Sequence, residues 1–214
     1  MVTSGQRCQY DSGMRPSFRL AIPQILEREA LPVDKFGHQP RLYRLTREIG
    51  KGLAYDDDVV FAAAWLHDLG VFIGHRPEGA TALKTWDHVA YACARAPEIL
   101  ASTDFPAEKI PAVLEAIRNH QPQDTPQSLE ATILRDADIL EQLGAIGILR
   151  NVSKVGRDTR YARFSEILPV LRRSLETLPG KIQLDATQAL AKPRIELLTA
   201  FLAAVEAEAG NLLY

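Results

Sequence analysis

The sequence has few cysteines, no excess of charge of one sign and no long apolar run, and each absence excludes a class of protein. Its two cysteines, Cys8 and Cys93, lie far apart and form no C-x-x-C pair of the kind that binds metal ions. Two distant cysteines build no disulfide scaffold, so we expect a cytoplasmic protein in a reducing compartment.

The charges nearly cancel, because 25 lysines and arginines accompany 27 aspartates and glutamates and give a formal net charge of -2. A protein that coats nucleic acid or an anionic membrane needs a positive field, so neither partner is expected. The longest apolar run, Val59 to Leu66, is far shorter than the roughly 20 residues that cross a bilayer. Residues 1–15 are polar, lack the apolar core of a signal peptide and are expected to be flexible.

Apolar residues are plentiful: 46% of the 214 residues are hydrophobic, and alanine and leucine are prominent among them. No stretch alternates apolar and polar residues as a half-buried strand does. Glycine, proline and capping residues instead divide the chain into predicted helices at about 18–28, 38–49, 57–70, 82–95, 107–119, 128–149, 162–177 and 184–208. Pro193 should kink or split the last of these helices.

This pattern predicts an all-α fold, a single-domain helical bundle over residues 16–214. Its chemically interesting residues lie in a core at about 30–150, and C-terminal helices at about 160–210 follow. Asp56, Asp57 and Asp58 should cap the third predicted helix and place negative charge in its first turn.

Two strongly polar side chains, His67 and Asp68, follow a very apolar segment in AAAWLHDLG. Burying such groups without a partner is costly, so they must reach water or find a strong partner. A divalent cation would satisfy both at once, because imidazole nitrogen and carboxylate oxygen both ligate Zn, Mn, Fe, Co or Ni. The alternative is a pair that merely ends the helix and faces water.

Other polar residues lie in places that call for an explanation. His38 begins a helix in GHQPR, and Arg41 follows one turn later, so the two could bind a metal and its anionic ligand together. Asp138 lies in ILRDADILEQLGAIG, on a helix that is otherwise apolar there. His88 in WDHVA and His120 in IRNHQP belong to the intervening helices, and each alone is more often an ordinary histidine than a ligand.

The order His38, His67-Asp68, Asp138 resembles the HD-domain superfamily of metal-dependent phosphohydrolases. The stretch DADILEQLGAIGILR is similar to small, stand-alone bacterial members of that superfamily. The resemblance implies that these four residues meet in a helical bundle and ligate a divalent metal ion (Mn, Fe, Zn, Co, Ni or Mg). Within the DAD triplet it assigns the ligand to Asp138, which leaves Asp136 in a supporting or surface position.

The resemblance also implies a reaction, in which a metal-activated water attacks a nucleotide or another small phosphate ester. Asp68 would ligate the metal and orient the water, and Arg41 would neutralise charge on the phosphoryl oxygens. His88 and His120 match, in position, the extra histidines of members with a second metal. Gln121 stands where members of the cyclic-dinucleotide type carry a further histidine.

Other functions remain open on the same residues. Members of this fold include di-iron oxygenases, which use both extra histidines, and hydratases that act on cyanamide at a single zinc. A third alternative is a non-catalytic domain that binds metal or nucleotide for regulation. No motif identifies a base, a sugar or an oligomeric state, and a homodimer is left open.

Several basic residues are weaker candidates for contact with a phosphate. They are Lys84, Arg44, Arg150 and the basic segment 154–163, each of which could equally be an ordinary solvated group. His75 is interpreted as a solvated loop histidine.

Overall fold

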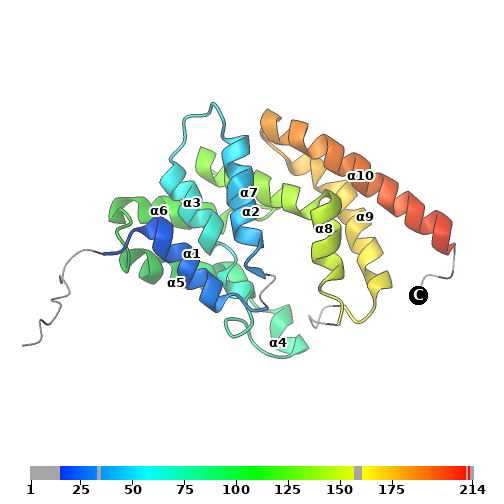
Figure 1. Cartoon of the computed structure of the whole chain (residues 1–214), viewed down its shortest axis with the longest axis horizontal. Coiled ribbons are helices and arrows are strands. Elements are labelled where there is room, and N and C mark those ends of the chain that lie inside the picture. The colour runs from blue at the N-terminus through cyan, green and yellow to red at the C-terminus, as the bar shows by residue number, and fades with distance from the viewer. Residues whose placement is uncertain (1–14, 33–34, 157–160, 211, 213–214) are drawn as a thin grey trace, which may run out of the picture.

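A computed structural model describes residues 15–32, 35–156, 161–210 and 212, and all regular elements in these ranges are helices (Figure 1). The all-α prediction is therefore confirmed, while the flexible segment predicted at 1–15 lies almost entirely outside the described residues. The α-helices are α1 (Phe18–Glu29), α2 (His38–Ile49), α3 (Asp57–Leu66), α4 (Ala80–Lys84), α5 (His88–Ala101), α6 (Ile110–Arg118), α7 (Leu129–Gln142), α8 (Gly144–Val152), α9 (Ile167–Thr177) and α10 (Asp185–Ala209).

Helix α3 is the centre of the bundle. Its residues Val59–Leu66 are all buried, which accounts for the uninterrupted apolar run, and the helix packs against α1, α2, α6 and α7. As predicted, Asp56 caps it by accepting hydrogen bonds from the backbone N–H groups of Asp58 and Val59. The α-helix ends at Leu66, before the predicted end at Gly70, because a short 3₁₀ helix, η2 (Leu69–Val71), follows.

Helix α7 joins the central bundle to the C-terminal helices. It packs against α2, α3 and α6 on one side and against α8 and α10 on the other, as Figure 1 shows. The prediction of a single helix at 128–149 is wrong, because the helix is interrupted between α7 and α8. Gly144 takes a positive φ of 70°, outside the α-helical region, and a Cβ there would lie 3.0 Å from the Cβ of Arg194 on α10.

Two further boundaries correct the sequence interpretation. The predicted helix at 82–95 is two helices, α4 and α5, since Asp87 caps a new helix by accepting a bond from Ala90 N–H at 2.8 Å. Pro193 does not split α10, which runs unbroken for 25 residues. Proline removes only one N–H donor, and packing of α10 against α7, α8 and α9 maintains the helix around it.

Within the described residues, no helix combines the length and the apolar character needed to span a membrane.

Candidate metal centre

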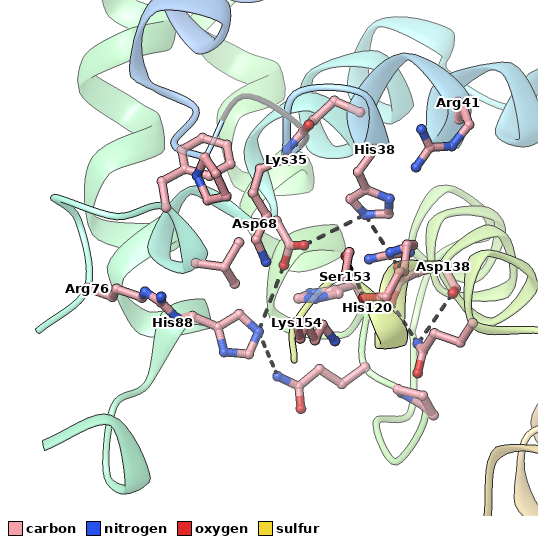
Figure 2. A pocket seen from close by; sticks show the side chains of 18 residues that line it. Lys35, His38, Arg41, Asp68, Arg76, His88, His120, Asp138, Ser153 and Lys154 are labelled. Carbon is pink, nitrogen blue, oxygen red and sulfur yellow. Dashed lines mark hydrogen bonds and ion pairs between the residues drawn. The ribbon is translucent and has the colours of Figure 1, made fainter. Parts of the chain in front are cut away.

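A cavity of about 330 Å³ lies where α2, the segment after α3, the start of α5, α7 and the end of α8 meet (Figure 2). Five predicted metal ligands line it, namely His38, Asp68, His88, His120 and Asp138. Five basic residues line the same cavity, namely Lys35, Arg41, Arg76, Arg150 and Lys154. His67 lies directly behind this lining and is fully buried.

The end of α3 positions His67 and Asp68. The backbone N–H of His67 still bonds to Ala63 O, as in the helix, but Asp68 leaves helical geometry with φ -102° and ψ 16°. This turn lets two consecutive side chains approach the cavity from the most buried helix of the protein. Their polar groups face other polar residues there, so the interpretation as a water-facing helix end is wrong for His67.

His38 and Asp138 complete the predicted set from α2 and α7. His38 Nε2 lies 3.2 Å from His67 Nε2, 3.5 Å from Asp138 Oδ1 and 3.7 Å from Asp68 Oδ2. His67 Nε2 lies 3.6 Å from the same Asp68 oxygen. Three segments that are far apart in the sequence thus bring four potential ligand atoms together.

The protonation of these rings favours a cation between them. His67 Nδ1 lies 3.0 Å from the carbonyl oxygen of Ala64, and His120 Nδ1 lies 2.6 Å from that of Ile117. A carbonyl oxygen only accepts, so each Nδ1 donates its proton and each neutral ring keeps a lone pair on Nε2. Lone pairs aimed into one space are the arrangement of histidine ligands whose other nitrogen is held by an oxygen.

Burial and charge act in opposite directions on this cluster. Burial lowers the pKa of His67 and of His120, so both rings stay neutral, the form that binds metal. Burial also raises the pKa of Asp68, but attraction to the neighbouring histidines in their protonated form, led by His67 and His38, outweighs burial and holds the pKa well below its ordinary value. Neutral imidazoles beside an ionised carboxylate are a donor set suited to a divalent transition metal.

Among the residues that the structure describes, two overlapping groups of side chains could hold a metal ion. One comprises His38, His67 and Asp138, and the other comprises His67, Asp68 and His120, with the ligand atoms of each group within 4.8 Å of one another. The four ligands predicted from the sequence and the extra histidine His120 are therefore brought together.

His88 lies farther out than the other predicted ligands. Its Nε2 is 4.0 Å from Asp68 Oδ1 and 3.3 Å from Nε2 of Gln121, and Figure 2 shows Asp68 between His38 and His88. Gly70 allows this approach, because a Cβ at that position would lie 2.5 Å from the His88 carbonyl oxygen. The glycine thus places the start of α5 against the segment that carries Asp68.

Sequence reasoning missed Glu141, which is 2% exposed on α7. Its Oε2 lies 3.3 Å from His38 Nδ1 and 3.1 Å from Arg41 Nη2, so the predicted residue Arg41 binds a carboxylate beside the cluster. Burial raises the pKa of Glu141, but His38, Arg41 and Arg150 outweigh it and lower the pKa to about 2. The available signal was spacing, since Glu141 follows Asp138 by three residues and shares its helix face.

Of the weaker phosphate candidates, Arg150 and Lys154 line the cavity. Lys84 lines a neighbouring hollow that includes His88 and Gln121, and Arg44 lines neither. Part of the basic segment 154–163, residues 157–160, lies outside the described residues.

Two residues that seemed peripheral in the sequence have internal structural roles. His75 is not a solvated loop histidine, because its Nδ1 lies 2.9 Å from Leu69 O and its Nε2 lies 3.4 Å from Glu29 Oε2. Asp136 is fully buried rather than on the surface, and it accepts bonds from the backbone N–H groups that precede α10, of Gln183 and Leu184. Its triplet partner Asp138 is the one that reaches the cavity.

Residues 36–143 match the family model of the HD domain, and this range includes every predicted ligand. No curated protein matches the chain. Solved structures with a similar fold include a predicted HD superfamily hydrolase from an uncultured Thermotogales bacterium, at 24% identity over 92% of this chain and 95% of that one, with TM-score 0.62. An HD-superfamily hydrolase from Bacillus thuringiensis has 20% identity over 91% and 97% of the two chains, with TM-score 0.65. Bacillus subtilis YpgQ in complex with ADP has 20% identity over 89% and 97%, with TM-score 0.63.

Proposed function

This chain belongs to the HD-domain family, and from that premise we propose that it is a metal-dependent phosphohydrolase for a nucleotide or another small phosphate ester. The observation that carries the proposal is one cavity with two kinds of lining. Histidines and aspartates with closely spaced nitrogen and oxygen atoms line it together with five basic side chains. A metal-binding group beside guanidinium and ammonium groups suits a reaction at an anionic phosphate.

We assign the first ion to the four residues predicted from the sequence, His38, His67, Asp68 and Asp138. Two imidazole nitrogens and two carboxylates fit Mn, Fe, Zn, Co or Ni, and Mg remains an option through the carboxylates. The chemistry that such an ion supplies is Lewis acidity and a lowered pKa for bound water.

The residues of the chain have distinct roles around this ion. Asp68 is ionised, and its two oxygens face different histidines, Oδ2 toward His38 and His67 and Oδ1 toward His88. A carboxylate with oxygens on two sides can bind a cation and also accept a hydrogen bond that orients the attacking water. Arg41 would bind the phosphoryl oxygens and stabilise the negative charge that grows on them.

A second, weaker metal position shares Asp68 in this proposal, with His120 and His88 as its other ligands. The shared carboxylate would offset repulsion between two cations, and few protein ligands would make the second ion the first one lost on dilution. Metal titration tests this: wild-type protein should saturate at two ions, and His88→Ala and His120→Ala at one. If wild-type protein saturates at one ion and both variants turn over as it does, the second position does not exist.

The size and charge of the cavity support a nucleotide as substrate. Its volume of about 330 Å³ is within the range of small-molecule sites, roughly 300–1,000 Å³. YpgQ, which shares the fold at 20% identity, was solved with ADP bound. A nucleoside phosphate would place its phosphate groups among the basic residues. Arg41 and Arg150 are the best candidates to bind them, because both contact Glu141 and so lie close to each other.

The decisive experiment is metal analysis of protein purified without chelator, followed by a phosphate-release screen. The screen covers nucleotides and simple phosphate esters, with Mn, Co, Ni, Mg or Fe added back in turn. Metal-dependent phosphate release from one class of substrate supports the proposal.

Other outcomes of the same experiment identify the rival functions. Iron-dependent oxygen consumption without phosphate release would assign the protein to the oxygenases of this fold. Zinc-dependent hydration of cyanamide would assign it to the hydratases. Nucleotide binding without turnover under any metal would indicate a regulatory domain.

A further inference from the structure

One carboxylate oxygen connects the metal-binding cluster to the basic residues of the cavity. Oε2 of Glu141 lies 3.3 Å from His38 Nδ1, 3.3 Å from Arg41 Nε, 3.1 Å from Arg41 Nη2 and 3.5 Å from Arg150 Nη1. Its partners come from two other helices, since His38 and Arg41 belong to α2 and Arg150 belongs to α8. The oxygen therefore joins α7 to both neighbours at the edge of the cavity.

The burial of Glu141 gives these contacts their significance. Its side chain is 2% exposed, and an ionised carboxylate in that position is stable only with strong hydrogen-bonded or charged partners. Arg41 and Arg150 supply the positive charge, while their own side chains remain 35% and 27% exposed at the cavity. The buried carboxylate thus holds two partly exposed cations in place.

We propose that Glu141 is the positioning residue of this site, which orients His38 toward the metal and holds Arg41 and Arg150 as a pair that binds phosphate. The proposal rests on the proposed function for the identity of the ligands, a divalent metal ion and a phosphate group. Glu141 itself contacts neither ligand, because it acts through the three residues that it binds.

The orientation of His38 follows from the geometry of the imidazole ring. With Nδ1 donating to Glu141, the lone pair is on Nε2, the atom that lies 3.5 Å from Asp138 Oδ1 and 3.2 Å from His67 Nε2. A carboxylate on the far nitrogen of a metal-binding histidine also makes the ring a stronger ligand. Loss of the carboxylate charge should therefore weaken metal binding without removing any ligand.

The pairing of the arginines follows from the shared oxygen. Arg150 also donates from Nη1 to the backbone carbonyl of Glu141 at 3.4 Å, so it binds both ends of this residue. A guanidinium carries five N–H groups, more than these contacts use, and the planar fork that remains suits two phosphoryl oxygens. Without Glu141 the two cations would repel each other, and long, partly exposed side chains would move apart.

The test compares Glu141→Gln, which keeps the shape and removes the charge, with Glu130→Gln on the same helix. Glu130 accepts a bond from the Asp56 backbone N–H and lies outside the cavity lining, so it controls for the loss of a charge from α7. Isothermal titration with Mn²⁺ should give a dissociation constant about 10- to 100-fold higher for Glu141→Gln. Inorganic phosphate, titrated at saturating Mn²⁺, should bind about tenfold more weakly. Glu130→Gln should match wild-type protein in both titrations.

A double-mutant cycle separates positioning from a general effect on folding. In the His38→Ala background, titrated at Mn²⁺ concentrations high enough to fill the weakened site, Glu141→Gln should change Mn²⁺ affinity by less than about twofold, because the ring that it orients is absent. An undiminished loss in that background would overturn the proposal, as would Mn²⁺ and phosphate affinities of Glu141→Gln within twofold of wild type. Should Glu141→Gln show no cooperative unfolding by circular dichroism, Glu141→Asp replaces it in the same cycle with the same criteria, because the side chain shorter by one methylene withdraws the carboxylate from His38 and Arg41.

Both titrations measure binding and require no turnover. A negative phosphate-release screen would therefore remove the proposed function and leave the role of Glu141 toward metal and phosphate to be decided by these affinities. Phosphate release by wild-type protein, together with unchanged Mn²⁺ and phosphate affinities in Glu141→Gln, would support the proposed function and exclude the role of Glu141.

Discussion

The two ends of α3 both carry acidic residues, but their surroundings differ. At the first turn, Asp57 and Asp58 bind Arg19, and Asp58 also binds Lys109 at 2.8 Å. After the last turn, Asp68 is surrounded by histidines instead. Basic side chains of the protein neutralise Asp57 and Asp58. The histidines around Asp68 carry a positive charge only when they are protonated.

The helix itself increases this contrast. Its N-terminus carries a partial positive charge that stabilises the first-turn aspartates, while its C-terminus carries a partial negative charge that opposes Asp68. The helix dipole therefore opposes an ionised Asp68, and a bound cation would offset this effect. We infer that the first cluster stabilises the fold and that the second is built to receive a cation.

The largest effect is expected from removing a proposed ligand after α3. His67→Ala or Asp68→Ala should abolish metal retention and phosphate release while far-UV circular dichroism stays helical, because each change removes one of the four ligands proposed for the ion and leaves the helices in place. Elemental analysis after gel filtration measures the metal. Asp57→Ala at the other end of α3 is the matched control and should retain it. Normal metal content in both His67→Ala and Asp68→Ala would exclude the assignment.

A chelator should lower the stability of the protein by removing the metal ion from the cluster around Asp68, and it should not affect the aspartates at the first turn of α3. A metal at 100 times its dissociation constant stabilises the folded state by about 2.7 kcal/mol, which corresponds to roughly 5–10 °C in Tm for a chain of this size. Differential scanning fluorimetry with and without a chelator should show this decrease for wild-type protein and for Asp57→Ala. Asp68→Ala should show no change, and a decrease there would mean that the chelated ion binds elsewhere.

Arg41→Ala separates phosphate binding from metal binding. Loss of a charge-assisted hydrogen bond should lower kcat/KM for phosphate esters about 10- to 100-fold, through a higher KM or a lower kcat. The number of bound metal ions should stay the same, because Arg41 is not among the ligands. Steady-state kinetics with parallel metal analysis tests both statements, and loss of the metal together with activity would contradict this division of roles.

The smallest effect on stability is expected from the ion pairs of Asp57 and Asp58 at the first turn of α3. Lys109 and Arg19 outweigh the effect of burial and lower the pKa of Asp58 below its ordinary value of 3.8. A lowered pKa in the folded state means that the stabilisation is present above about pH 4 and disappears as the pH falls through the folded-state value. Because Asp58 is 30% exposed, Asp58→Asn should cost only about 0.5–1 kcal/mol at pH 7.

Urea unfolding of wild-type protein and Asp58→Asn at pH 7, 5 and 3 measures this difference. The gap between their free energies of unfolding should be similar at pH 7 and 5 and should narrow at pH 3. A gap that widens toward pH 3 would show that the sign is wrong. Metal content should be unaffected at pH 7.

Local sequence patterns were enough to predict the helical class and the main ligand candidates. Asp56 as a cap and His67-Asp68 after an apolar run depend on neighbours in the chain, so a single sequence reveals them. The match to the HD domain over residues 36–143 confirms the family that this order of residues resembles. The ligand roles of these residues stay predictions until metal is measured.

The tertiary structure decided what depends on distant partners. The predicted helix is interrupted at Gly144, where the chain lies against Arg194 of α10. Asp136 is buried beneath the segment before α10, and His75 packs against Glu29. Each of these contacts joins residues that are more than 40 positions apart, so no local periodicity reports them.

Glu141 shows the same division within the site itself. Its spacing from Asp138 was visible in the sequence, but a glutamate on a helix is most often solvated, and nothing local marks this one as buried. Only the packing of α2 and α8 against α7 brings His38, Arg41 and Arg150 to its carboxylate. The sequence by itself determined which residues could bind a metal ion, because ligand chemistry belongs to the side chain. The tertiary structure determined how they are oriented and charged, because orientation and pKa depend on partners that only folding brings together.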